Sequence, residues 1–233
     1  MRDRTAVILG VSIIAAAMVF GMFFVRARAG EHTISVVGSA IQTFDSDVVK
    51  WRVNVVRTAS LQTLPEAYAK IRGDIAEVVK QLIAHNIDEK RISVQPVSTH
   101  PVYEREGISG YRVQQSLYVI SDSLTLIEKL ALAPDTFASK GIIVEFSNLE
   151  YFNSQVDTLK VSLLGAAMKD ARNRADEIAK GSGVKVGRIV SARSGVFQIT
   201  EPYSNEAAAG GAYNTSSKTK DIRVTTHVTF TLK

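Results

Sequence analysis

One stretch near the N-terminus constrains this chain more than any other feature. The twenty-one residues from Thr5 to Val25 include no charged side chain. As an α-helix they extend about 31 Å, which is about the thickness of a bilayer's hydrocarbon core. Their apolar side chains are spread around the whole helix, an arrangement that suits lipid better than a protein core. We therefore expect residues 1–29 to be a membrane anchor and residues 30–233 to form a separate domain.

Three interpretations of this stretch stay open. It is an uncleaved signal anchor, a cleaved signal peptide or a buried core helix. The triplet Ala27-Arg28-Ala29 matches the small-x-small cleavage pattern, whereas the uncharged run is longer than the apolar region of an ordinary signal peptide. Two arginines flank the run on each side, so the positive-inside rule does not orient it.

Charge and cysteine content limit the function of the remaining domain. Residues 1–29 hold four arginines and one aspartate, net +3, so the formal +5 of the chain leaves only +2 for residues 30–233. A nearly neutral domain lacks the basic footprint of a nucleic-acid binder, and we expect no nucleic-acid partner. The chain has no cysteine, which fits an oxidising compartment.

The domain alternates strand and helix patterns, which predicts an α+β fold. Helices are expected between Thr63 and Asn86 and over residues 123–132 and 153–180, on one side of a largely antiparallel sheet. On the longest helix, the predicted inner side includes Ala167, Ala171, Ala175 and Ile178. Strands are expected at residues 33–38, 48–58, 91–97, 111–120, 142–149, 187–198 and 222–232.

Two strand orders remain open. The segment Tyr111–Gln115 is echoed 111 residues later by Ile222–Thr226, which indicates duplicated β-α-β-β units over 48–120 and 142–232. The alternative is a ferredoxin-like β-α-β-β-α-β order over Val48–Leu149 with α-β-β appended. In both, the sheet side away from the helices carries Lys50, Arg52, Arg112 and Arg223, a basic surface that we interpret as a partner or self-association face. An ordinary solvated surface is the alternative.

Searches for reactive motifs give no catalytic, cofactor-binding or metal-binding residue. The four histidines have no metal-ligand spacing, and Asp45-Ser46-Asp47 lacks the glycine and distal glutamate of a calcium loop. The chain is therefore expected not to be an enzyme and to need no cofactor. The segment Thr200–Thr219 is too long for a tight hairpin, and we expect either a mobile loop or an ordered binding loop.

Several segments of the chain resemble the SIMPL-domain family. They are the start Thr33–Ala40, the helix 167–179 with the strand 183–189 after it, the stretch 194–199 and the closing Lys220–Val224. The resemblance covers residues 31–233 and extends to the membrane-anchored bacterial branch. It implies an α+β cell-envelope protein, periplasmic or secreted, with a tendency to self-assemble. Some members are associated with oxidative-stress defence, and the family offers no agreed catalytic residues.

The combined expectation is a single-pass protein of the bacterial inner membrane with a periplasmic interaction or assembly domain. Its partners are the membrane and either further copies of itself or another envelope protein. Cleavage and secretion to the periplasm is the alternative location. The alternative function is small-ligand binding in a cleft between the two halves, with residues 200–219 as a lid.

Overall fold

The computed structural model describes residues 2–28, 32–105 and 107–233, and the side chains of 10–24, 32–105 and 107–233. The chain folds as two compact units. Unit 1 consists of Met1–Ala40, Leu164–Gly195 and Thr225–Lys233, and unit 2 of Ile41–Leu163 and Val196–Val224. The cleavage point considered after Ala29 lies outside the described residues.

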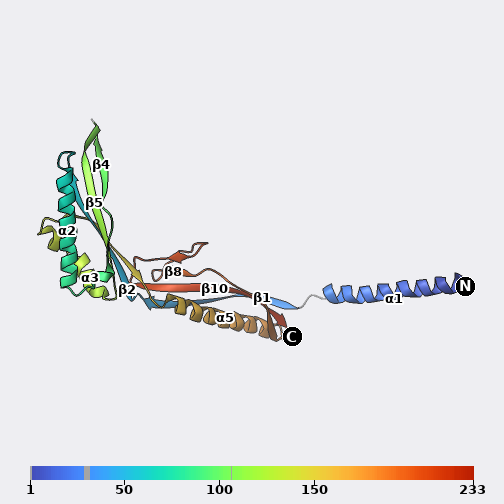
Figure 1. Ribbon diagram of the computed structural model, residues 1–233. Helices are drawn as coiled ribbons and strands as arrows, with labels where there is room; N and C mark the ends of the chain where they lie inside the picture. The colour runs from blue at the N-terminus through green and yellow to red at the C-terminus, as the bar shows by residue number, and fades with distance from the viewer. Residues whose placement is uncertain (1, 29–31, 106) are drawn as a thin grey trace. The chain divides into compact units, whose positions relative to one another are not determined.

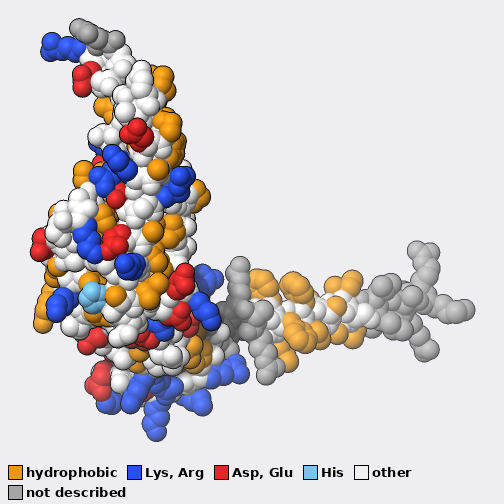
Figure 2. Space-filling model, turned by 60° about the vertical axis from the view of Figure 1, so that its left-hand side comes forward, with side chains coloured by type: hydrophobic (Ala, Val, Ile, Leu, Met, Phe, Trp, Pro, Cys, Tyr) orange, Lys and Arg blue, Asp and Glu red, His pale blue; other side chains and the backbone are white. Residues whose placement is uncertain are grey.

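An uninterrupted helix, α1 (Arg2–Arg28), covers the uncharged stretch. Its described side chains are those of residues 10–24, and its large apolar ones are exposed, for example Val11 at 62% and Phe20 at 70% (Figure 2). The rings of Phe20 and Phe24 stack with centroids 6.0 Å apart. Within the described part of the chain, no helix combines the length and the apolarity that a membrane crossing requires.

Unit 2 contains a five-stranded antiparallel sheet, which we call sheet B. Its order is β3-β5-β2-β6, and β4 also pairs with β5. The strands are β2 (Val48–Ala59), β3 (Ile92–Val94), β4 (Ser98–Glu104), β5 (Gly107–Ser121) and β6 (Val144–Phe152). The order β6-β2-β5-β3 is the ferredoxin-like one, so the alternative strand order is confirmed. The duplication is wrong, because β6 pairs with β2 and not with the last strand of the chain.

Helices cover one face of sheet B. Figure 1 shows α2 (Leu64–Ala84) and α3 (Leu124–Ala131) beside this sheet. Trp51 and Val53 of β2 point into this layer and are fully buried. The Trp51 ring lies 6.3 Å from that of Phe137 on the short helix α4 (Asp135–Ala138), and a one-turn 3-10 helix, η1 (Glu89–Arg91), precedes β3. Burial of large apolar side chains on one sheet face is the main force that holds α2 and α3 in place.

A second five-stranded sheet, sheet A, corrects the expectation of a single sheet. Its order is β1-β10-β8-β9, with β7 also on β10. Strand β10 pairs antiparallel with β7 and β8, and β8 pairs parallel with β9. The strands are β1 (Thr33–Asp45), β7 (Val186–Ser194), β8 (Gln198–Thr200), β9 (Ala212–Tyr213) and β10 (Thr219–Leu232). The echo between Tyr111–Gln115 and Ile222–Thr226 therefore reflects two long strands of different sheets, each with an alternating buried and exposed pattern.

The helix α5 (Val156–Gly181) belongs to unit 1 from Leu164 onward, and this part packs on sheet A through its alanines. Ala171, Ala175 and Ala179 are buried among Val228 and Phe230 of β10. The expectation for Ile178 is wrong, because that side chain is 57% exposed. A spacing of four residues after Ala175 returns to the inner face of the helix at position 179, not at 178.

Candidate functional site

The side of sheet B away from α2 and α3 is open. Side chains alternate along a strand, so the inward Trp51 and Val53 leave Lys50 and Arg52 on the open side. We call this surface the outer face. Its side chains come from β2, β5 and β6, and they are Lys50, Arg52, Asn54, Arg112, Gln114, Ser116, Tyr118, Ile120, Glu145, Phe146, Asn148 and Glu150.

A β-bulge brings an acidic side chain onto the outer face. Asn54 pairs with Phe146, but Val55 pairs with Val144, so Glu145 is an extra residue in β6. Such bulges redirect side chains. The Glu145 carboxylate accepts a 3.1 Å hydrogen bond from the Asn54 amide and pairs with the guanidinium of Arg112. The charge of Arg112 is therefore balanced locally.

Tyr118 lies between two cations of β2. The Arg52 guanidinium donates a 2.6 Å hydrogen bond to the Tyr118 hydroxyl, and its central carbon lies 5.0 Å from the ring centroid. The ammonium of Lys50 is 4.8 Å from the same centroid and 3.7 Å from the Glu150 carboxylate. Cations at these distances are attracted to the face of an aromatic ring. Arg52 has no carboxylate partner among the described residues.

Hydrogen bonds also order the middle of the outer face. The Ser116 hydroxyl donates to the Asn54 side-chain oxygen at 2.9 Å, and the Asn54 amide approaches the Gln114 oxygen at 3.5 Å. The side-chain nitrogen of Gln114 lies 3.4 Å from Nε2 of the His100 ring. The outer face is thus a connected polar surface on which Glu145 and Glu150 accompany the cations that the sequence placed there.

Arg223 does not belong to the outer face. It lies exposed on β10, whose partners are β1, β7 and β8 of sheet A. Of the four predicted face residues, the structure brings together Lys50, Arg52 and Arg112 only. The expectation failed because it placed all strands in one sheet.

A buried lysine in unit 2 was missed by the sequence interpretation. The Lys220 side chain is 0% exposed, and its ammonium donates hydrogen bonds to the Ser46 hydroxyl at 2.8 Å and the Tyr151 carbonyl at 2.9 Å. It forms no ion pair with a described carboxylate. Burial lowers the pKa of Lys220 to about 8. The sequence could have indicated this burial, because Lys220 lies two and four residues before the buried Ile222 and Val224 and so points to the same side of the strand.

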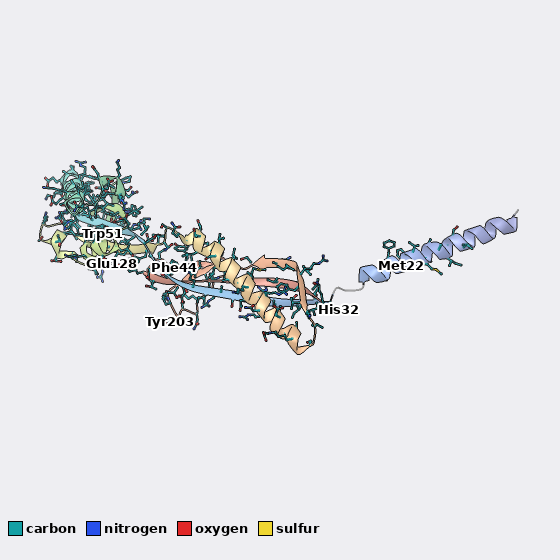
Figure 3. All side chains as sticks on the ribbon, turned by 90° about the horizontal axis from the view of Figure 1, so that it is seen from below. Met22, His32, Phe44, Trp51, Glu128 and Tyr203 are labelled. Atoms are coloured by element: carbon teal, nitrogen blue, oxygen red, sulfur yellow. The ribbon has the colours of Figure 1, made fainter. Side chains whose placement is uncertain are left out.

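The surroundings of Lys220 are polar and neutral on balance. Burial, then a 3.0 Å hydrogen bond to Glu128, raises the pKa of Tyr151 to about 12. The Glu128 carboxylate also pairs with the ammonium of Lys218 at 3.1 Å. Trp51 and Glu128 are labelled in the same region of unit 2 in Figure 3. Since Lys220 is closed off from solvent, we assign this cluster a structural role.

No described group suggests a metal or catalytic centre. Among residues 32–105 and 107–233, no three histidine or acidic side chains come close enough to hold a metal ion. The Asp45-Ser46-Asp47 turn uses its carboxylates internally, since Asp47 accepts hydrogen bonds of 2.7 and 2.6 Å from the backbone and hydroxyl of Ser154. These bonds, the hydroxyl one foremost, lower the pKa of Asp47.

Hydrogen bonds connect several residues of the segment 200–219. The side-chain oxygen of Asn214 accepts bonds from the backbone of Ser216 and Ser217, and its amide donates to Glu201 at 2.7 Å. The Gln198 side-chain amide donates a hydrogen bond to the Ala208 carbonyl, and its oxygen accepts one from the Ala208 backbone N–H. Tyr203 is 99% exposed at its tip.

The family comparison agrees with these features. The chain matches the family model SIMPL, described as a protein of unknown function (DUF541), over residues 34–231. This chain belongs to the SIMPL family. A comparison with curated proteins gives no match. The matched range includes both sheets of the SIMPL domain and begins after α1.

The structure explains one of the glycines in the resembling segments. A Cβ added to Gly38 of the SIMPL domain would lie 2.6 Å from the Ala171 Cβ and would also meet the Ala167 carbonyl. Only a residue without a side chain lets β1 approach α5 this closely. The Ser39 amide then donates a 2.8 Å bond to Asp170, which also pairs with Arg174 at 2.8 Å.

Proposed function

We propose that this SIMPL protein is a non-enzymatic assembly module of the bacterial cell envelope. Its N-terminal helix holds it in the inner membrane, its folded domain lies in the periplasm, and copies associate through the outer face of sheet B. The observation that carries the proposal is that outer face, an open sheet surface whose polar side chains are already ordered by hydrogen bonds.

The charge pattern of the outer face favours a second copy as partner. The face carries the cations Lys50, Arg52 and Arg112 together with the carboxylates Glu145 and Glu150. In a two-fold contact each patch meets its own copy turned around, so a surface with both signs can be self-complementary. Electrostatic complementarity of this kind selects the partner and the register more than it adds affinity.

The sequence supports the proposed membrane anchor. The uncharged run extends from Thr5 to Val25, beyond the described side chains 10–24 on both sides. An exposed, uncharged and apolar helix needs a cover, and lipid is the cover that fits a helix apolar on all sides. Cleavage after Ala29 with release to the periplasm is the alternative.

The absence of cysteine allows a direct test of topology. A Lys233→Cys variant in intact cells is expected to react with a maleimide that cannot cross the inner membrane, after the outer membrane is permeabilised. Intact mass of the purified protein separates the anchor from the cleaved form. If labelling occurs only after cell lysis, the periplasmic location is wrong.

Site-specific cross-linking tests the association face. Full-length protein with Asn148→Cys, on the outer face, is expected to form dimers with a short bis-maleimide. The matched control is Ala76→Cys, which is exposed on α2 behind the other face. Equal cross-linking of the two variants, or a strict monomer by sedimentation at high concentration, contradicts the proposal.

A role in oxidative-stress defence is the further part of this proposal, and only the family resemblance supports it. A chain without cysteine has no thiol to oxidise, so such a role does not use thiol chemistry of this chain. A deletion strain is expected to lose survival under peroxide, and the Asn148→Cys protein blocked by maleimide is expected not to restore it.

A further inference from the structure

A hollow of about 470 Å³ lies at one end of the outer face. Its floor is formed by Val48, Tyr118 and Ile120, and its rim includes Lys90 and Arg91. Ligand pockets for small molecules typically measure about 300–1,000 Å³. None of the residues 200–219 lines this hollow, so it does not depend on the lid that the sequence suggested.

The floor of the hollow is apolar and accessible. Ile120 is 49% exposed although it stands on β5, a central strand of sheet B, next to Lys50 in the β2–β5 register. The Tyr118 side chain lies beside it on the same face. Covering such side chains with an apolar or aromatic body is favourable by about 25 cal/mol per Å².

The rim of the hollow carries more positive charge than its partners neutralise. Asp122 holds Arg91 through two contacts of 3.0 and 3.1 Å, and this pairing lowers the pKa of Asp122. Lys90 has no ion-pair partner among the described residues, although the carboxylate of Asp88 caps its backbone at 2.9 Å. Arg52 donates a hydrogen bond to the Tyr118 hydroxyl but does not line the hollow.

We propose that this hollow binds a small amphipathic anion. An aromatic or aliphatic body lies on Tyr118 and Ile120, while a carboxylate, sulfonate or similar group meets the charge of Lys90. The Tyr118 hydroxyl, already bonded to Arg52 at 2.6 Å, offers its own proton to the anion. The site shares the outer face with the proposed association surface, but it does not depend on association.

The matched fluorescent probes 8-anilinonaphthalene-1-sulfonate and N-phenyl-1-naphthylamine test both halves of the site. They share the aromatic body, and only the first carries an anionic group. The full-length protein is expected to bind the sulfonate saturably at one site per chain, and the neutral probe at least about tenfold more weakly. Equal binding of the two probes, or no saturable binding, overturns the proposal.

Variants locate the site on the protein. Lys90→Gln is expected to weaken sulfonate binding about tenfold, and Ile120→Glu to abolish it. Lys70→Gln, exposed on α2, is the control that keeps full affinity. All three positions are exposed, so melting temperatures stay unchanged and a folding defect is recognised separately. Unchanged binding in Lys90→Gln overturns the proposal.

Competition distinguishes two sources of the ligand chemistry. Displacement of the sulfonate by 1-naphthoate and not by decanoate assigns the site to aromatic carboxylates, and the reverse assigns it to lipid-derived acids. Displacement by neither overturns the proposal. Because the cross-linking of Asn148→Cys is measured independently, failure of association and failure of ligand binding remain distinguishable.

Discussion

The ammonium group of Lys220 donates a 2.8 Å hydrogen bond to the hydroxyl of Ser46, and among the described residues no carboxylate pairs with either side chain. A cation enclosed in this way loses its hydration and recovers it only in part through two neutral acceptors. Such a group decreases stability in its charged form and becomes harmless once it is neutral. This relationship makes the stability of unit 2 depend on pH.

We expect the stability of unit 2 to rise from about pH 8 to pH 10.5. The folded pKa of Lys220, about 8, lies below its unfolded value, so the unfolded chain binds more protons in this window. Below pH 8 both states are protonated and the full penalty, about 3 kcal/mol, is present. Tyr151, with its folded pKa of about 12, stays neutral in the folded state, but it ionises in the unfolded chain above about pH 10 and offsets part of the rise there.

A Lys220→Met variant isolates this effect. Urea unfolding monitored through Trp51, the single tryptophan of the chain, reports on unit 2. The stability of the natural chain minus that of the variant is expected to increase by about 3 kcal/mol between pH 7.5 and 10.5. A difference that does not change with pH contradicts the assignment of an unpaired buried charge.

The ion pair between Arg57 and Asp74 connects β2 to α2 inside unit 2. The guanidinium donates hydrogen bonds of 2.6 and 2.7 Å to the two carboxylate oxygens, and the bond to Asp74 raises the pKa of Arg57. Asp74→Ala leaves a partly buried cation without its partner, and we expect a loss of about 3 kcal/mol. The double variant Arg57→Met/Asp74→Leu is expected to recover most of it. A double variant as unstable as the single one contradicts this explanation.

Gly38 is expected to tolerate no side chain. A Cβ there meets the backbone of α5 at Ala171, at a distance of 2.5 Å from its nitrogen, so Gly38→Ala separates β1 from α5 and destabilises unit 1 by about 3 kcal/mol. Gly165→Ala is the control in the same unit, since nothing lies within 4 Å of its added Cβ. A helical glycine replaced by alanine gains about 1 kcal/mol. Hydrogen exchange of the α5 amides measures both, and equal protection in the two variants contradicts the close-approach argument.

Charge reversal tests the outer face as an association surface. Arg112→Glu places two carboxylates together at Glu145 and is expected to weaken self-association about tenfold in sedimentation equilibrium. The exchange Arg112→Glu/Glu145→Arg restores the pair and the association. Arg223→Glu, on sheet A, is the matched control and leaves association unchanged. A stronger effect of Arg223→Glu than of Arg112→Glu moves the interface to the other sheet.

The order of the elements along the chain could be predicted from local patterns. Local patterns predicted the buried side of β2, with Trp51, Val53 and Val55, and the buried alanine side of α5. They did so because burial repeats every second residue in a strand and every third or fourth in a helix. The prediction for Ile178 was wrong, because nothing in the sequence indicates that an apolar residue one position away from the buried alanines is exposed.

The family, the α+β class and the uncharged N-terminal helix were within reach of the sequence alone, because each is written in residue order and spacing. The number of sheets, the outward turn of Glu145 and the enclosure of Lys220 were decided by tertiary structure. Those features depend on which strands pair, and the pairing of distant segments brings the Lys220 ammonium within 2.8 Å of the Ser46 hydroxyl. No local pattern encodes such a partner, because hydrogen bonds between strands are made by backbone groups that every residue shares.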